Sequence, residues 1–144
     1  MDDITANSAA RQRVLDLTRG LTADQYRAPI GGGWTVGAEL AHLAFWDRTH
    51  MERLRRALAA GQAAPPPLPD GLADIINDAA LPGWRDIPGA AALQLFEAAA
   101  RDADNYLASL DAATLEMVRS GGAPRLIQRF RHRGEHADAI ERGR

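Results

Sequence analysis

The feature that most constrains the fold is a long amphipathic stretch, residues 35–60, that runs directly into a proline-rich segment. Its apolar residues recur at spacings of three and four and at multiples of these: Val36, Leu40, Leu43, Leu54 and Leu58. This period places them on one face of a helix, and Thr35 can cap the first turn. The next segment, GQAAPPPLPDG at residues 61–71, cannot stay helical because proline lacks a backbone donor and fixes φ. We therefore expect a long helix followed by an extended crossover.

Three further segments carry the signals of long helices. Residues 5–19 end at Gly20, a residue suited to the end of a helix. Pro88 fits the first turn of another helix, whose apolar stripe consists of Ala92, Phe96, Ala99, Ala103, Leu107 and Leu110. The turn SGGAP at residues 120–124 precedes a last helix, expected from about Arg125 to Glu141.

Shorter helical turns are expected around residues 22–25, 72–80 and 111–118. Alternating apolar runs rich in β-branched and aromatic residues are missing from the sequence, so a sheet has little to build on. We therefore predict an all-α chain, residues 1–144 as a single domain. Its fold would be a four-helix bundle with a long crossover between the second and third long helices.

The composition excludes several classes of function. The chain contains no cysteine, which rules out disulfides, thiolate metal sites and a side-chain thiol nucleophile; sulfur chemistry would need a small-molecule thiol. A net charge of −2 gives no electrostatic reason to expect nucleic acid as a partner. The N-terminus is polar and acidic, and no apolar run approaches the ~18 residues that span a bilayer. These features predict a cytoplasmic protein without a membrane partner.

Two histidines lie four residues apart in FRHRGEHADAIE, residues 130–141. His132 and His136 would share one face of the last helix, so that both imidazoles can converge on one metal ion. An alternative is that they interact with the negative end of the helix dipole, while the neighbouring Arg129, Arg131 and Arg133 stay in water. The pair alone leaves both interpretations open.

His42 strengthens the metal hypothesis. It lies on the second long helix in WTVGAELAHLAFWDR, where Phe45 and Trp46 share its face, so it is not on a solvated surface. A core histidine with satisfied hydrogen bonds is the alternative. Three histidines on two helices form the usual ligand set of an open metal site, with a fourth position for water or substrate. His50 lies about 80° from His42 around the helix and is interpreted as a surface or rim residue.

The letters HRGEH also match the pattern H-x-x-E-H, in which Glu135 would be the base of a metalloprotease. We disfavour this reading, because that motif needs a further acidic ligand downstream and only eight residues follow His136. Glu135 remains a possible base or a partner of a ligand, with an exposed position on the helix preferred. The expected lining of a cofactor or substrate pocket is Phe45, Trp46, Gln128 and Arg129, with Arg129 as a partner for a substrate carboxylate.

The segment GWTVGAELAHLAFWDR, residues 33–48, resembles the Trp, Ser/Thr and helix-borne His signature of the DinB/YfiT-like superfamily. This superfamily includes the metal-binding N-terminal domain of mycothiol-dependent maleylpyruvate isomerase. His132 and His136, followed by Ala-Asp-Ala-Ile, resemble its closing helix. The resemblance covers essentially the whole chain and implies an up-down-down-up four-helix bundle. It further implies a divalent metal (Zn, Ni, Mn or Fe) held by His42, His132 and His136.

The resemblance also bears on activity and partners. Similar proteins are often homodimers, and several use a thiol such as mycothiol or bacillithiol that the metal activates. We therefore expect a metal-dependent, thiol-dependent S-transferase acting on a small molecule. A metal-dependent hydrolase is the alternative, and a non-catalytic bundle that binds metal or dimerises is the third hypothesis.

Overall fold

The structure is a computed structural model in which residues 1–143 are described. It is an all-α bundle, as predicted. The helices are α1 (Asp3–Thr18), α2 (Ala23–Arg27), α3 (Val36–Ala59), α4 (Leu72–Asp86), α5 (Gly89–Ser109), α6 (Ala112–Ser120), α7 (Pro124–Ile127) and α8 (Arg129–Gly143). Two short strands, β1 (Pro29–Gly31) and β2 (Trp34–Thr35), pair antiparallel.

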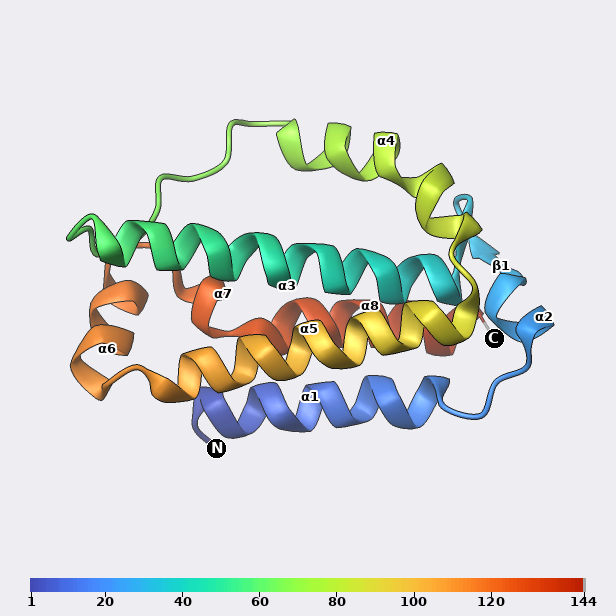
Figure 1. The fold of residues 1–144 in the computed structure, drawn as a ribbon, viewed down its shortest axis with the longest axis horizontal. Coiled ribbons are helices and arrows are strands. Elements are labelled where there is room, and N and C mark those ends of the chain that lie inside the picture. Colours follow the sequence, from blue (N-terminus) through green and yellow to red (C-terminus); the bar gives the residue numbers. More distant parts are fainter. Residues whose placement is uncertain (144) are drawn as a thin grey trace.

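The four long helices α1, α3, α5 and α8 lie side by side and form the bundle (Figure 1). α3 packs along α5, and α1 packs against α8 and α5. In the view of Figure 1, α1 and α8 run from left to right, whereas α3 and α5 run from right to left. Because α3 and α5 point the same way, the chain between them has to return along the bundle. The proline-rich segment and α4 make this return over the outside of α3.

Helix α4 is longer than the short stretch expected at residues 72–80. It continues to Asp86 even though Pro82 lies inside it. Trp84 is buried in this extension, where it packs with Ala38 and Ala41 of α3. The packing of this large side chain stabilises helical residues beyond the point where local sequence predicts an end.

Two other details differ from the sequence-based expectation. A small hairpin forms at residues 29–35, because Gly31, Gly32 and Gly33 all adopt positive φ and turn the chain tightly before Thr35 caps α3. The last helix is divided at Gln128 into α7 and α8. Asn7 of α1 stabilises this break, because its amide donates to the carbonyl of Ile127 at 2.8 Å and accepts from the backbone N–H of Phe130 at 2.8 Å.

Besides the cluster around Trp84, the apolar core contains two larger clusters along the bundle. One includes Leu40 and Leu43 of α3 together with Phe96 of α5, and the other includes Met51 and Leu54 of α3. Asp47 lies between these positions on α3 and is fully buried. The interior therefore contains charge at the point where the two apolar clusters adjoin.

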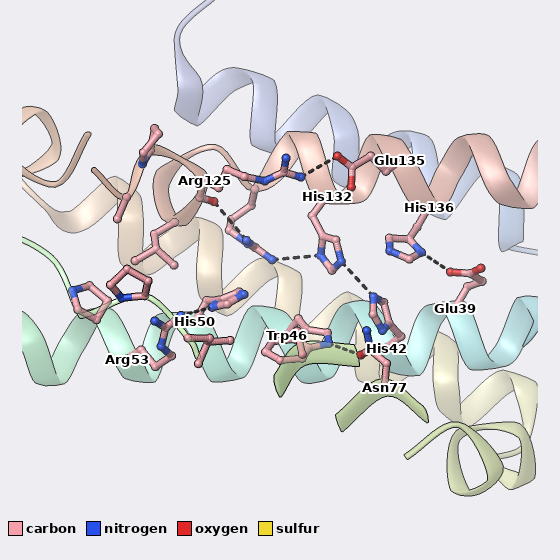
Figure 2. A pocket seen from close by; sticks show the side chains of 18 of the residues that line it. Glu39, His42, Trp46, His50, Arg53, Asn77, Arg125, His132, Glu135 and His136 are labelled. Carbon is pink, nitrogen blue, oxygen red and sulfur yellow. Dashed lines mark hydrogen bonds and ion pairs between the residues drawn. The ribbon is translucent and has the colours of Figure 1, made fainter. Parts of the chain in front are cut away.

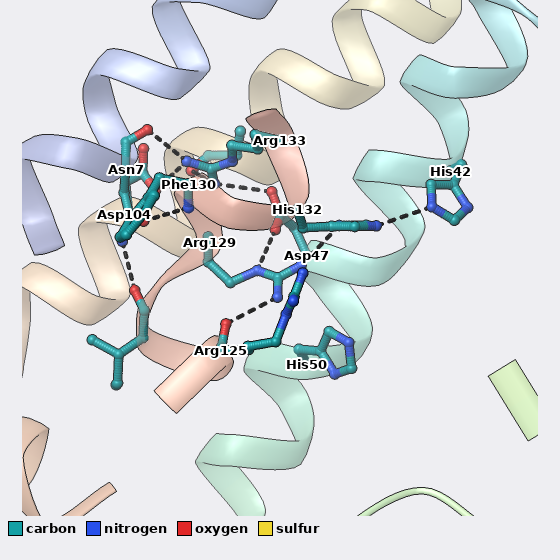
Figure 3. Close-up of polar contacts among 12 residues, drawn as sticks. Asn7, His42, Asp47, His50, Asp104, Arg125, Arg129, Phe130, His132 and Arg133 are labelled. Carbon is teal, nitrogen blue, oxygen red and sulfur yellow. Dashed lines mark hydrogen bonds and ion pairs between the residues drawn. The ribbon is translucent and has the colours of Figure 1, made fainter. Parts of the chain in front are cut away.

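Asp47 is the centre of a buried ionic cluster, shown in Figure 3. Its two carboxylate oxygens accept from Arg129 Nε at 2.8 Å and from an Arg133 guanidinium nitrogen at 2.9 Å. Arg133 also donates to Asp104 of α5 at 2.8 Å and to the carbonyl of Asn7 at 2.9 Å. The alternative that left the arginines of the last helix in water is therefore wrong for Arg129 and Arg133, because each has a buried carboxylate partner.

None of the helices within residues 1–143 is long and apolar enough to cross a bilayer.

Removing the carboxylate of Asp47 tests how much the ionic cluster contributes to the free energy of unfolding. We expect Asp47→Ala and the near-isosteric Asp47→Asn to lower the free energy of unfolding by about 3–5 kcal/mol, because two buried guanidinium groups lose their shared partner. Urea unfolding followed by circular dichroism measures this loss. The control is Asp102→Ala, which breaks the exposed ion pair between Asp102 and Arg48 and should change stability little. Similar losses at both positions would contradict the assignment.

Two glycines test the packing around the bundle. A Cβ at Gly89 would lie 2.2 Å from Cγ of Tyr26, whose hydroxyl donates to the carbonyl of Thr18 and fixes the ring. We expect Gly89→Ala to cost about 1–3 kcal/mol. Gly134 on α8 has open space where a Cβ would lie, so Gly134→Ala should stabilise by about 0.5–1 kcal/mol. Thermal unfolding of the two variants should give shifts of opposite sign.

Candidate metal centre

Three histidines predicted from the sequence to lie together do meet in the structure. His42 comes from α3, and His132 and His136 come from α8, which lies beside it (Figure 2). Each histidine contributes one ring nitrogen, and these three nitrogens all lie within 4.8 Å of one another. The Nε2 atoms of His42 and His132 are 3.0 Å apart. This cluster can hold a divalent metal ion, which agrees with the ligand set predicted from the sequence.

The environment of His42 explains its charge state. The side chain is buried, and the rings of Trp34 and Trp84 meet it edge-on with centroids 5.2 and 5.3 Å away. Burial lowers the pKa of His42 to about 3, and the positive charge of Arg129 acts in the same direction. The imidazole is therefore neutral at pH 7, which is the form that binds a metal.

The two ring nitrogens of His42 have different surroundings. Its Nδ1 is buried and makes no hydrogen bond of normal geometry among residues 1–143, although the side chain of Asn77 is near enough to raise the pKa of His42. Nε2 is the His42 nitrogen that faces His132, and the fit of a metal ion rests on the convergence of the three imidazoles.

Glu39 orients the second ligand of α8. Its buried carboxylate accepts a hydrogen bond from Nδ1 of His136. The other nitrogen of that imidazole, Nε2, is thereby left for a ligand. A carboxylate behind a histidine in this way is the usual support of a metal-binding imidazole, since it fixes the tautomer and the ring orientation. The three imidazoles and Glu39 therefore suit a divalent first-row metal such as zinc.

Arg129 contacts the third histidine and defines its tautomer. A guanidinium nitrogen of Arg129 lies 3.2 Å from Nδ1 of His132. Because arginine can only donate, Nδ1 accepts and the imidazole proton lies on Nε2, facing Nε2 of His42. Burial, followed by the charge of Arg129, lowers the pKa of His132 far below its ordinary value. Coordination through Nε2 would require the neutral imidazole to carry its proton on Nδ1 instead, with Arg129 no longer donating to that atom.

A cavity of about 920 Å³ extends from the histidines between α3, α4, α7 and α8. Trp46 and Arg129, two of the pocket residues expected from the sequence, are among its lining residues. Phe45 and Gln128 are not. Phe45 is partly exposed and packs edge-on against Trp46, and the Gln128 side chain accepts from Arg131 at 2.7 Å.

Glu135 lies at the edge of the cavity. Its carboxylate accepts from Arg125 at 2.7 Å, and its side chain is 57% exposed. The preferred expectation for this residue was an exposed position on the helix, and the structure places it there. The ion pair with Arg125 occupies its carboxylate.

Several residues of the cavity were not anticipated. His50, expected at a surface or rim, stacks on Trp46 with ring centroids 5.1 Å apart. Burial lowers its pKa to about 3. Arg53 and Asn77 also line the cavity, and Asn77 accepts from the Trp46 indole at 2.8 Å. A sequence signal existed on α3, where residues 42, 46, 50 and 53 follow one another at helical spacing.

Comparison with known proteins agrees with the geometry. A family model described as the DinB superfamily matches residues 6–141. No curated protein and no solved structure matches the chain. The family match spans nearly the whole sequence, and the chain therefore belongs to the DinB superfamily.

Proposed function

We propose that this protein is a metal-dependent enzyme that transfers a small-molecule thiol to a small electrophile. The observation that carries the proposal is the cluster of three histidines at one end of a cavity of about 920 Å³. The chain has no cysteine, so the sulfur has to come from a cosubstrate such as mycothiol or bacillithiol. The metals that suit the ligands are Zn, Ni, Mn and Fe.

The residues around the three histidines have distinct roles in the proposed reaction. A divalent ion held by His42, His132 and His136 would supply a Lewis acid that lowers the pKa of a thiol or water. Glu39 holds the His136 ring in position through its Nδ1 proton. Arg129 adds positive charge beside His132, which favours a thiolate over a thiol. Trp34 and Trp84 shield His42 from water.

The cavity suits a small molecule. Its volume lies within the ~300–1,000 Å³ typical of ligand pockets. Its wall combines apolar side chains, such as Trp46, Leu68 and Leu126, with a few polar groups. This combination is typical of sites that bury a ligand and orient it with few hydrogen bonds.

The state of the carboxylates favours a thiol over water as the nucleophile. Both acidic residues that line the cavity are paired, Glu39 with His136 and Glu135 with Arg125. Among residues 1–143, the cavity therefore lacks a free carboxylate to serve as a general base. A thiol has an ordinary pKa of about 8.5 and needs much less help than water to lose its proton. Metal-dependent hydrolysis is the second candidate, because the same open position can hold water.

Metal content provides the first test. We expect tag-free protein to carry stoichiometric divalent metal after growth in medium containing Zn, Ni, Mn and Fe, measured by plasma mass spectrometry. His42→Ala and His132→Ala should lose it because each removes a ligand. His50→Ala is the matched control, since this histidine lies on the same helix outside the cluster, and it should retain the metal. Folded native protein without metal would refute the site.

Turnover separates the three hypotheses. We expect metal-loaded protein to join a low-molecular-weight thiol to 1-chloro-2,4-dinitrobenzene: the sulfur–carbon bond forms, chloride leaves and the thiol proton goes to solvent. Absorbance of the product measures the rate. Glu39→Gln should lower metal affinity or rate by about 10–100-fold, because His136 loses its carboxylate partner.

The same assay contains the outcomes that contradict this proposal. Cleavage of an ester panel without thiol would identify a hydrolase. Metal-loaded protein that turns over neither the thiol and electrophile panels nor the esters would support the non-catalytic, metal-binding bundle.

A further inference from the structure

The cavity has a second chemical region at the end away from the three histidines. On α3, His42, Trp46, His50 and Arg53 all line the cavity at successive spacings of four, four and three residues. Eleven residues make about three helical turns, so His42 and Arg53 share one face with Cα atoms about 16 Å apart. Figure 2 shows the imidazole of His42 near one end of the pocket and Arg53 near the other, with Trp46 between them.

The opposite wall, formed by α7 and α8, has a similar sequence of side chains, but here the arginines come before the histidines along the chain. Four cavity residues there follow at spacings of four, three and four along α7 and α8: Arg125, Arg129, His132 and His136. On each wall a histidine of the cluster therefore lies at one end, His42 or His136, and an arginine lies at the other, Arg53 or Arg125. The cavity has a metal-binding end, defined by the three histidines, and a cationic end, defined by Arg53 and Arg125, with the neutral His50 beside Arg53.

Arg53 differs from the other arginines of the cavity in its partners. Arg129 is paired with Asp47, and Arg125 is paired with Glu135. Arg53 makes no ion pair with any carboxylate in residues 1–143. It donates only to uncharged acceptors, Nδ1 of His50 at 2.9 Å and the carbonyl of Pro66 at 2.6 Å. Its positive charge is therefore not balanced locally.

The partly buried position makes this unbalanced charge significant. Burial lowers the pKa of Arg53, although the guanidinium remains protonated at pH 7. Buried or half-buried cations are normally paired, because desolvation of a charge is costly. A guanidinium has five N–H donors, of which two are used here, so that donors remain for a ligand.

His50 adds a donor to the same region. Because Arg53 donates to its Nδ1, the proton of the neutral imidazole lies on Nε2. The cationic end therefore presents N–H groups from two side chains. The planar donor set of arginine matches the oxygens of a carboxylate or a phosphate.

A structural role for Arg53 accounts for only part of this arrangement. Its bond to the Pro66 carbonyl attaches the proline-rich crossover to α3. A neutral donor would make the same contact without placing a positive charge in the wall of a cavity. The charge therefore needs a separate explanation.

We propose that Arg53 binds the oxyanion group, a carboxylate or a phosphate, of an elongated small molecule whose other end lies at the three histidines. The apolar middle of this molecule would lie along Trp46. The identity of the end at the histidines rests on the proposed function, whereas binding of the anionic group to Arg53 does not. The substrate class is thus an amphiphilic small acid or phosphoester.

Calorimetric titration of the full chain, before and after metal loading, tests the proposal. The probes are 5-phenylpentanoate, 4-phenylbutyl phosphate and the uncharged 4-phenylbutanol, which share the 4-phenylbutyl group. We expect the better of the two anions to bind about tenfold more tightly than the alcohol, and the comparison of carboxylate with phosphate identifies the preferred group. Equal affinities of all three probes would overturn the proposal.

Variants assign the preference to one residue. Arg53→Gln should reduce the preference for the anion to within about twofold, and Arg53→Lys should keep part of it, because the charge remains without the planar donor set. Arg56→Gln is the matched control, since this arginine is on the same helix, pairs with Glu52 and has an 80% exposed side chain. It should keep the full preference. A purely structural role of Arg53 would change thermal stability and weaken all three probes equally.

Metal content measured on the same preparations separates this inference from the proposed function. Protein that binds no metal yet prefers the anions would refute the metal-dependent enzyme and support the role of Arg53. Protein that binds metal and transfers thiols, but does not distinguish the anions from the alcohol, would refute the role of Arg53 alone.

Discussion

The ion pair between Asp47 and Arg133 is the interaction on which the rest of the structure depends. Both side chains are completely buried, and the cluster around them includes Asn7, Asp104 and Arg129. It thereby links α1, α3, α5 and α8. An unpaired charge in this position is strongly destabilising, so a shift of α8 along α3 by a single turn would be costly. We infer that the cluster fixes the register of these helices.

That register also sets the geometry of the candidate metal centre. The Arg133 side chain is completely buried. Its neighbours on α8, His132 and His136, lie directly against His42 of α3 (Figure 2). Arg129 belongs to both regions, because it donates to Asp47 with Nε and to His132 with a guanidinium nitrogen. The histidines are thus held by the same charges that hold the bundle together.

Local patterns in the sequence were sufficient for the long helices and for the pair His132 and His136, because helical period and i,i+4 spacing are properties of short segments. His42 lies 90 residues from His132, and its grouping with the pair came from the predicted bundle and the family resemblance. Local patterns were not sufficient where the decisive partner is distant in sequence. Arg133 can be buried because it pairs with Asp47, which lies 86 residues away in the sequence. The break at Gln128 depends on hydrogen bonds from Asn7 in the first helix. Glu39 was missed for the same reason, since its partner His136 lies 97 residues further on.

The proline-rich crossover shows how one sequence feature serves both fold and site. Its prolines prevent a helix, which leaves carbonyl groups without the internal partners that a helix would provide. One of these, the carbonyl of Pro66, accepts from Arg53, while Pro65 and Pro67 line the cavity. The extended crossover therefore forms part of the pocket wall and holds Arg53 there. A helical connection of the same length would satisfy its own carbonyl groups and would offer Arg53 no such acceptor.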